Sequence, residues 1–257
     1  MSAVVFDLDG TLIDSVAAVC DVANMLMNEL ALPPLNVEEA RVYIGNGAGK
    51  FLERALSARG ALQPDTHAAR LQRFLAHYAQ APGEANGPYP GAETTLRRLA
   101  AAGHAIGLCT NKPLTPTQIA INALGWTDLF DVVIAGDMLE HRKPHPQPLL
   151  EVARRLGQKA VIYVGDSKVD EATAKAARIP FVLYKEGYRT VAVDQFEAAA
   201  TFSDFNKLPD VLGRVVAGLW TVTGEVANSR LASRSQKEEA SLSRGRLQAT
   251  AGSRISR

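Results

Sequence analysis

Short, uninterrupted apolar runs bounded by Gly, Asp, Asn or Pro alternate along most of the chain with longer segments of helical periodicity. Unbroken apolar runs are expected of strands that are covered on both faces, as in a parallel sheet. Strands alternating with helices predict βαβ units, and therefore an α/β fold with an open, doubly wound, Rossmann-like parallel sheet. The predicted strands are Ala3–Phe6, Ala105–Cys109, Val132–Ile134, Ala160–Val164 and Phe181–Leu183, and the predicted helices are Ala92–Ala101, Pro116–Leu124, Pro146–Leu156 and Asp170–Ala177.

One interval, from Val16 to about Asn86, breaks this alternation because it contains amphipathic helical stretches and no convincing strand. Roughly seventy residues is much longer than an ordinary crossover between two strands. We therefore predict an α-helical cap domain, residues 16–87, inserted into a core domain of residues 1–15 and 88–220, with Asp14 and Ser15 capping its first helix. Its predicted helices are Val16–Leu30, Val37–Ile44, Gly49–Ser57 and Thr66–Ala79.

Charge is distributed unevenly along the 257 residues, although the formal net charge is only +1. Residues 221–257 hold seven of the 28 basic residues and three of the 27 acidic ones, so the rest of the chain carries a net charge of −3. This basic, Ser/Arg-rich tail has too little apolar content to fold alone, and we expect it to be disordered. A mildly acidic body does not favour a nucleic acid as its partner.

Other features of the composition point to a cytoplasmic protein. The sequence has no apolar run of about 18 residues and no signal-like N-terminus, which argues against a membrane partner and against secretion. Its two cysteines, Cys20 and Cys109, are too few for a disulfide framework and are interpreted as reduced thiols.

Polar residues stand where the predicted strands end, which is where an open α/β sheet binds its ligands. Asp7 and Asp9 follow the first strand, and their period-two spacing directs both to the same side. Asp166 and Asp170 follow another strand, and carboxylates gathered in this way favour an all-oxygen Mg²⁺ site. Two further groups could hold a phosphate: Thr110-Asn111 at the end of the second strand, and Lys143 before a helix.

These residues match four motifs in order, Asp7-x-Asp9-Gly10-Thr11, Thr110, Lys143 and Gly165-Asp166-x-x-x-Asp170. In this pattern the chain resembles the haloacid dehalogenase-like hydrolase superfamily, and within it the phosphoglycolate phosphatases, over about residues 3–215. The resemblance implies a Mg²⁺-dependent phosphatase that forms a phosphoaspartate. It gives Asp7 the role of nucleophile and Asp9 that of general acid and base. The phosphoryl group would be bound by Thr110, Asn111 and Lys143. Mg²⁺ would be held by Asp7, Asp166 and the Asp9 carbonyl, with Asp170 in a supporting position.

Selectivity would come from the cap, because all phosphate monoesters share the reacting group. The segment Gly45-Asn46-Gly47 resembles one typical of phosphoglycolate phosphatases, and it precedes a helix whose N-terminus favours an anion. We expect this loop, with Lys50 or Arg54, to face the carboxylate of a small anionic phosphate ester, 2-phosphoglycolate, which would be hydrolysed to glycolate.

Other functions remain open on the same scaffold. One alternative is another phosphohydrolase or a phosphomutase acting on pyrophosphate or a sugar phosphate, since fold and superfamily do not fix the substrate. A non-catalytic binding module is the alternative of another class. The sequence leaves the oligomeric state open between monomer and homodimer.

Overall fold

The computed structural model of the protein describes residues 2–81, 87–158 and 160–218. Met1–Leu212 forms one compact unit and Gly213–Arg257 a second, of which the described residues, 213–218, are helical. The tail predicted for residues 221–257 therefore lies outside the described residues.

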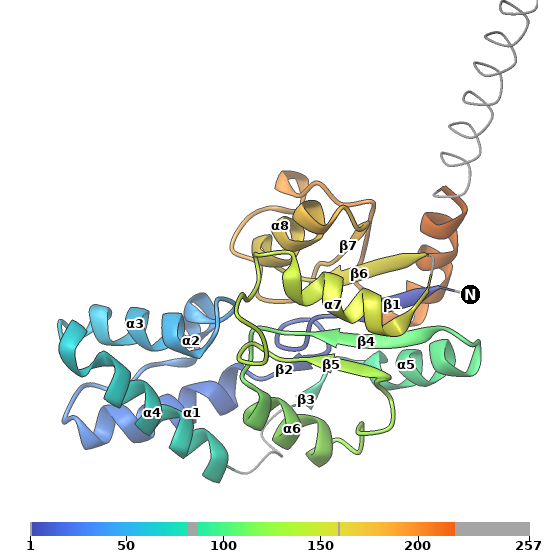
Figure 1. Cartoon of the computed structure of the whole chain (residues 1–257). Coiled ribbons are helices and arrows are strands. Elements are labelled where there is room, and N and C mark those ends of the chain that lie inside the picture. The colour runs from blue at the N-terminus through green and yellow to red at the C-terminus, as the bar shows by residue number, and fades with distance from the viewer. Residues whose placement is uncertain (1, 82–86, 159, 219–257) are drawn as a thin grey trace, which may run out of the picture. The chain divides into compact units, whose positions relative to one another are not determined.

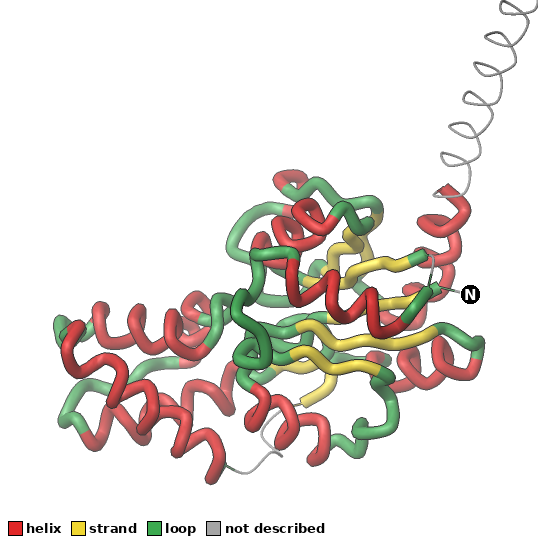
Figure 2. The backbone as a smooth tube through the Cα atoms, in the orientation of Figure 1, coloured by secondary structure: helices red, strands yellow, loops and turns green. Residues whose placement is uncertain are grey.

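A six-stranded sheet forms the centre of the first unit (Figures 1 and 2). Its order is β5-β4-β1-β6-β7-β8, and every neighbouring pair is parallel. The predicted α/β class and the five predicted strands are confirmed, with ends shifted by at most one residue. The strands are β1 (Ala3–Phe6), β4 (Ala105–Cys109), β5 (Val132–Ile134), β6 (Val161–Gly165), β7 (Phe181–Tyr184) and β8 (Ala200–Phe202).

Helices cover both faces of the sheet, as a doubly wound fold requires. From β1 the chain steps outward to β4 and β5, and then returns past β1 to β6, β7 and β8. Because crossovers between parallel strands are right-handed, this reversal puts α5 and α6 on one face and α7 and α8 on the other (Figure 1). The helices are α5 (Ala92–Ala101), α6 (Leu114–Ala123), α7 (Gln147–Leu156) and α8 (Lys168–Ala177).

The side chains of the central strands alternate between these two layers. Val5 and Tyr163 are register partners on β1 and β6, and both pack with Leu149 and Val152 of α7 in one buried cluster. Gly107 of β4 lies opposite Val5, and a Cβ there would stand 2.4 Å from the Val152 side chain. The missing side chain therefore lets α7 approach the sheet closely.

Two of the helices that cover the sheet begin two residues earlier than predicted. The α6 helix starts at Leu114, two residues before the predicted start at Pro116. The first turn of a helix tolerates proline, so Pro116 does not have to be the first residue. The α8 helix starts at Lys168 because Ser167 and Asp170 form a reciprocal capping box, which makes Asp170 the third residue of the helix.

Four helices lie in the described residues between Asp14 and Gly87, in agreement with the predicted helical segments (Figure 1). They share a core that includes Leu26, Leu52 and Phe74, each at most 1% exposed. We call this segment the cap; its division from the core domain at residues 16 and 87 remains a prediction. The helices are α1 (Val16–Glu29), α2 (Val37–Tyr43), α3 (Ala48–Ala58) and α4 (Pro64–Gln80).

The chain enters and leaves the cap through two short strands that were not predicted from the sequence. In β2 (Ile13–Asp14) and β3 (Gly87–Pro88), Ile13 is the register partner of Pro88, and the two strands are antiparallel. Two residues are too few to show a periodicity. The edge strand β8 was missed for a similar reason, because its three residues alternate in burial instead of forming an apolar run.

The predicted cap of α1 is only partly correct. The Asp14 carboxylate accepts a hydrogen bond from the Val16 N–H at 3.2 Å, but the Ser15 side chain makes no capping hydrogen bond. Its hydroxyl instead donates to Asp9. No described helix is long and apolar enough to cross a membrane.

Candidate active site

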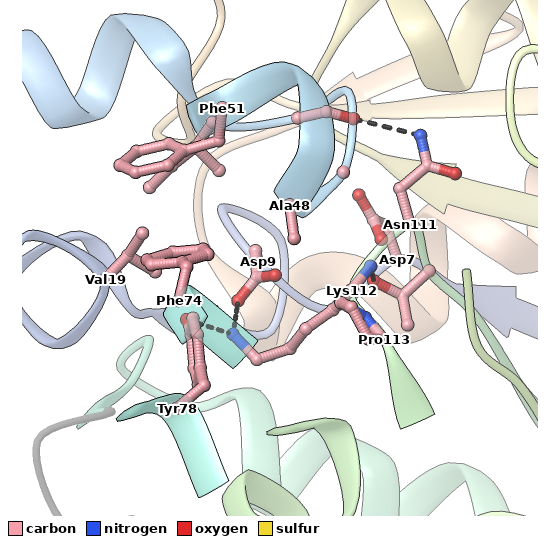
Figure 3. A pocket seen from close by; sticks show the side chains of 14 residues that line it. Asp7, Asp9, Val19, Ala48, Phe51, Phe74, Tyr78, Asn111, Lys112 and Pro113 are labelled. Carbon is pink, nitrogen blue, oxygen red and sulfur yellow. Dashed lines mark hydrogen bonds and ion pairs between the residues drawn. The ribbon is translucent and has the colours of Figure 1, made fainter. Parts of the chain in front are cut away.

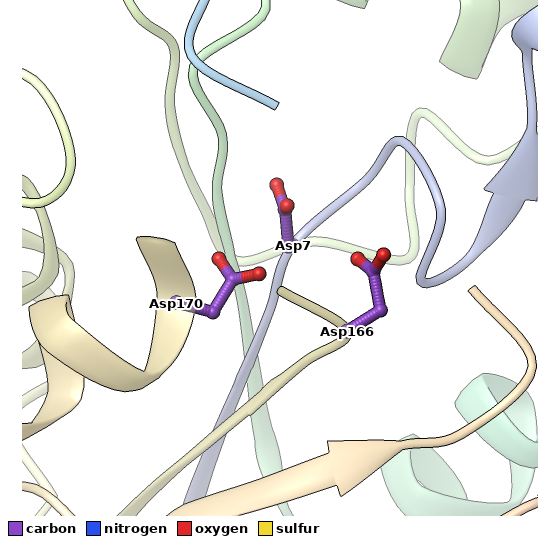
Figure 4. A group of neighbouring side chains, drawn as sticks. All are labelled: Asp7, Asp166 and Asp170. Atoms are coloured by element: carbon purple, nitrogen blue, oxygen red, sulfur yellow. The ribbon is translucent and has the colours of Figure 1, made fainter. Parts of the chain in front are cut away.

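The site forms at the carboxyl ends of β1 and β6, where the direction of the strand order reverses. Connections leave these two neighbouring strands towards opposite faces of the sheet, which opens a crevice at their ends. Asp7 directly follows β1, and Asp166 directly follows β6. Both side chains are buried, and Figure 4 shows them facing one another together with Asp170.

Lys143 is held between two of these carboxylates. Its Nζ lies 2.8 Å from Asp7 Oδ1 and 2.8 Å from Asp170 Oδ1, and it also donates to the Tyr163 hydroxyl at 2.9 Å. Asp170 is fully engaged, because its other oxygen accepts hydrogen bonds from the Ser167 amide and hydroxyl. Burial favours the neutral acid, but the Lys143 charge and these hydrogen bonds outweigh it and lower the pKa of Asp170. The predicted supporting role of Asp170 thus takes a concrete form: it holds Lys143.

Asp7 and Asp166 carry a surplus of negative charge. Burial, opposed by Lys143, raises the pKa of Asp7 to about 7, and burial together with the charges of Asp170 and Asp7 raises that of Asp166 well above its ordinary value. Asp7 Oδ1 is buried and makes no contact with the geometry of a hydrogen bond, so that its interaction with Lys143 is an ion pair only. Two buried carboxyl groups this close stay ionised together only beside a cation; otherwise one of them is protonated.

A divalent metal fits this arrangement. Oxygen atoms of Asp7, Asp166 and Asp170 lie within 4.8 Å of one another. Three carboxylates and the single Lys143 ammonium sum to a charge of −2 when all are ionised, which one divalent cation neutralises. Hard oxygen donors suit Mg²⁺. Each oxygen of Asp170 already accepts two hydrogen bonds, whereas each oxygen of Asp166 accepts one, so Asp7 and Asp166 are the better ligands.

Asp9 lies on the other side of Asp7, where it contacts Lys112 and Ser15. Its Oδ1 accepts hydrogen bonds from the Lys112 ammonium at 2.9 Å and the Ser15 hydroxyl at 2.5 Å. Lys112 follows β4, and its Nζ also donates to the Tyr78 hydroxyl of α4 at 3.0 Å. A chain of polar contacts thus joins the first motif to the cap.

Thr110 and Asn111 occupy the end of β4, as predicted, but they play different parts. The buried Thr110 hydroxyl accepts a hydrogen bond from the Lys112 amide at 3.1 Å. The Asn111 amide donates to the carbonyls of Gly45 at 3.1 Å and Lys143 at 3.0 Å. Both N–H groups of the side-chain amide are therefore engaged, and the side chain joins the cap loop to the core. The predicted contact of Asn111 with a phosphoryl group stays a prediction.

These residues surround a cavity with about 50 Å³ of space open to the centres of water molecules. At roughly 10–15 Å³ for each water, it has room for a small ligand. Figure 3 shows Asp7, Asp9 and Lys112 at one end of the cavity and the rings of Phe51 and Phe74 towards the cap. The lining residues are Asp7, Asp9, Val19, Ile44, Gly45, Gly47, Ala48, Phe51, Phe74, Tyr78, Thr110, Asn111, Lys112 and Pro113.

A model of haloacid dehalogenase-like hydrolases matches residues 1–178, which include all four motifs. The chain belongs to this hydrolase family. Several curated members are close relatives. "Phosphoglycolate phosphatase" of Cereibacter sphaeroides is 44% identical over 219 residues, 84% of this chain and 100% of that protein. The protein of the same name from Rhodospirillum rubrum is 43% identical over 218 residues, 82% of this chain and 90% of that protein.

Solved structures of the family share the fold. A predicted phosphoglycolate phosphatase from Haemophilus somnus superposes with a TM-score of 0.76 at 28% identity, covering 82% of this chain and 97% of that one. A β-phosphoglucomutase from Clostridium difficile gives 0.68 at 17% identity, covering 84% and 98%. The second likeness concerns the fold alone, because fold does not determine the reaction.

The cap of this hydrolase differs from the prediction in its charged residues. Gly45 and Gly47 line the cavity, but the Asn46 side chain does not, since it accepts a hydrogen bond from Arg54 at 2.8 Å. Arg54 also donates to the Tyr43 carbonyl and so braces the loop. Lys50 pairs with Glu53 on the surface. Neither Lys50 nor Arg54 lines the cavity, so the expectation that one of them faces the substrate is wrong in this structure.

Sequence reasoning missed Lys112. It follows Asn111 directly and is 5% exposed, with its ammonium 4.9 Å from the centre of the Tyr78 ring. The signal for it was its position at the end of an apolar strand, next to two residues already assigned to the site. Its partners Asp9 and Tyr78 are 103 and 34 positions away in the sequence, so only the fold reveals the contact.

Proposed function

We propose that this hydrolase is a Mg²⁺-dependent phosphatase that converts 2-phosphoglycolate to glycolate and phosphate through a phosphoaspartate on Asp7. The observation that carries the proposal is the pair of carboxylates in one small cavity: Asp7 is ion-paired with Lys143, and Asp9 lines the same cavity. The names of relatives up to 44% identical, which are matched over 90% or more of their length, support the substrate.

The first step transfers the phosphoryl group to the protein. An oxygen of the Asp7 carboxylate attacks phosphorus, and the bond between phosphorus and the ester oxygen breaks. Asp9, in its protonated form, gives its proton to the departing alkoxide of glycolate. Lys143, 2.8 Å from Asp7 Oδ1, keeps the nucleophile oriented and offers positive charge to the phosphoryl oxygens.

The second step releases phosphate. Asp9, now a carboxylate, removes a proton from a water molecule whose oxygen attacks phosphorus, and the bond between phosphorus and Asp7 breaks. The Lys112 ammonium and the Ser15 hydroxyl both donate to Asp9 Oδ1 and hold its carboxyl group in place for this proton transfer. Asp9 ends the cycle protonated, ready for the next leaving group.

The metal has a defined place in the proposal. Asp7, Asp166 and the main-chain carbonyl of Asp9 would hold Mg²⁺, which neutralises charge on the phosphoryl oxygens when bound. Asp166 is fixed for this task, because its two oxygens accept hydrogen bonds from the Thr11 hydroxyl at 2.8 Å and the Tyr188 amide at 2.6 Å.

The cavity favours a small ester over a sugar phosphate. The side chains of Val19, Ile44, Phe51 and Phe74 form its apolar walls, and these offer no partners for sugar hydroxyls. A buried hydroxyl without a partner costs about 1–3 kcal/mol, so each unmatched hydroxyl would weaken binding.

We place the reaction in the cytoplasm, where the two buried thiols, Cys20 and Cys109, stay reduced.

A phosphate-release assay tests the proposal. The wild-type protein should hydrolyse 2-phosphoglycolate with a higher kcat/KM than ethyl phosphate, which lacks the carboxylate, and only with Mg²⁺ present. Asp7→Asn should keep the fold, checked by circular dichroism, and lose at least about 10³-fold in kcat. Equal kcat/KM values for the two esters would contradict the proposed substrate. Substantial Mg²⁺-dependent turnover by Asp7→Asn would contradict the proposed mechanism.

A further inference from the structure

Lys112 differs from every other residue that lines the cavity. It is the one cationic side chain among those lining residues, within the part of the chain that the structure describes. Lys143 is assigned to Asp7 and Asp170, and the cap cations Lys50 and Arg54 are engaged outside the cavity. A second anionic group on a bound substrate has Lys112 as its available counter-charge.

The hydrogen bonds of Lys112 leave room for such a group. An ammonium has three N–H donors. Two of them are used by Asp9 Oδ1 at 2.9 Å and by the Tyr78 hydroxyl at 3.0 Å, and among the described residues the third has no protein acceptor. A buried N–H group without an acceptor costs free energy, so a ligand that accepts a hydrogen bond from it binds more tightly. Low polarity around the buried ammonium strengthens its attraction for an anion.

Lys112 is also fixed in place from both sides of the cavity. Asp9 belongs to the loop after β1, whereas Tyr78 belongs to α4, where its ring packs edge-on against Phe74 with centroids 5.6 Å apart. Little side-chain entropy is left to lose when a ligand binds.

We propose that Lys112 binds the carboxylate of the substrate and thereby determines selectivity for small phosphate esters that carry a second negative charge. This inference rests on the proposed function and extends it. Lys112 uses its third N–H for the carboxylate while it still contacts Asp9, so the same ammonium recognises the acid end of the substrate and orients the group that protonates its ester oxygen. The loop of Gly45 and Gly47 then encloses the ligand without supplying a charge.

The test uses two non-hydrolysable ligands that differ only in the second charge. 3-Phosphonopropionate has the shape of phosphoglycolate with a methylene in place of the ester oxygen, and propylphosphonate replaces its carboxylate with a methyl group. Calorimetric titration with Mg²⁺ present should give a Kd for the first that is about ten- to hundredfold lower in the wild-type protein, the value of a hydrogen bond between charged groups. No chemistry at Asp9 enters this measurement.

Two substitutions then isolate the contribution of the Lys112 ammonium. Lys112→Met keeps the length of the stem and should reduce the ratio of the two Kd values to near one, with little change in the Kd of propylphosphonate. Lys50→Met, a matched loss of one lysine outside the cavity, should keep the full ratio. If thermal melting shows that Lys112→Met is unfolded, Lys112→Gln is used with the same expectation.

The outcomes distinguish the two proposals. If the variant at Lys112 keeps the wild-type ratio while the wild-type enzyme prefers phosphoglycolate to ethyl phosphate in turnover, the role of Lys112 in recognition is overturned and the proposed function stands. If the wild-type protein shows neither the binding ratio nor the preference in turnover, both proposals fail. A ratio that collapses in the Lys112 variant and survives in Lys50→Met supports both.

Discussion

Replacing Asp170 or Asp166 with asparagine should change the stability of the Mg²⁺-free protein in opposite directions. Asp170 contacts Lys143 at 2.8 Å, and both side chains are at most 3% exposed. Breaking a buried ion pair from one side costs about 3–5 kcal/mol. Because Lys143 keeps Asp7 as a partner, we expect the lower end of this range, about 3 kcal/mol of unfolding free energy, for Asp170→Asn.

Asp166 has no cation beside it among the described residues, and its raised pKa means that ionisation in the folded state is unfavourable. An asparagine can keep both of its hydrogen bonds: the amide oxygen accepts from the Tyr188 N–H, and the amide nitrogen donates to the Thr11 hydroxyl oxygen. Asp166→Asn should therefore be at least as stable as the wild-type protein at pH 7.5 in EDTA.

Urea denaturation followed by circular dichroism measures both changes. A carboxyl group with a raised folded pKa makes the protein lose stability as pH rises from its unfolded pKa towards the folded one. The advantage of Asp166→Asn over the wild-type protein should thus grow between pH 5 and pH 8. Mg²⁺ at a hundred times its Kd should add about 2.7 kcal/mol to the wild-type protein and much less to Asp166→Asn. Destabilisation of similar size in both variants would refute this account of the charges.

Three further predictions concern the site and the cap. Ser15→Ala removes a hydrogen bond to Asp9 Oδ1 and should lower kcat about tenfold with little change in melting temperature, so an unchanged kcat in a phosphate-release assay would contradict the role given to Ser15. Phe74→Ala should cost about 3–5 kcal/mol in urea denaturation, because the ring is 1% exposed in the cap core; a loss below about 1 kcal/mol would contradict that packing. Arg59 lowers the pKa of Glu39 to about 2, so this pair adds stability above the ordinary pKa of 4.5 and loses it as pH falls towards 2. Glu39→Gln should accordingly lower the melting temperature at pH 7, with a difference that narrows in acid; a constant difference would count against the pair.

The parts of the fold with strong local signals could be predicted from the sequence. Buried strands such as Val161–Gly165 have unbroken apolar runs, and the cap helices are amphipathic over two or more turns. Both patterns can be recognised in a short stretch of sequence. The two-residue strand Ile13–Asp14 and the edge strand Ala200–Phe202 depend on partners elsewhere in the chain. No pattern within either segment could reveal them.

The site shows the same division. Motifs at strand ends locate Asp7, Asp9 and Asp166, because the geometry of a parallel sheet brings those ends together. The hydrogen-bond partners of each side chain depend on contacts between residues that are far apart in the sequence. The sequence could not show that the Asn111 side chain donates to two carbonyl groups, and the position of Lys112 at the end of a strand did not reveal its contacts with Asp9 and Tyr78.

The short strands β2 and β3 mean that the cap begins and ends at one place. Asp14 is the register partner of Gly87, so the two points where the polypeptide crosses into the cap lie a single strand spacing apart. A spacing of about 4.8 Å is close enough for a tight turn to close the gap. The cap is therefore a single inserted segment whose two ends are adjacent in space. Exchange of the intervening sequence between relatives should leave Asp7 and Asp166, at the ends of β1 and β6, in place.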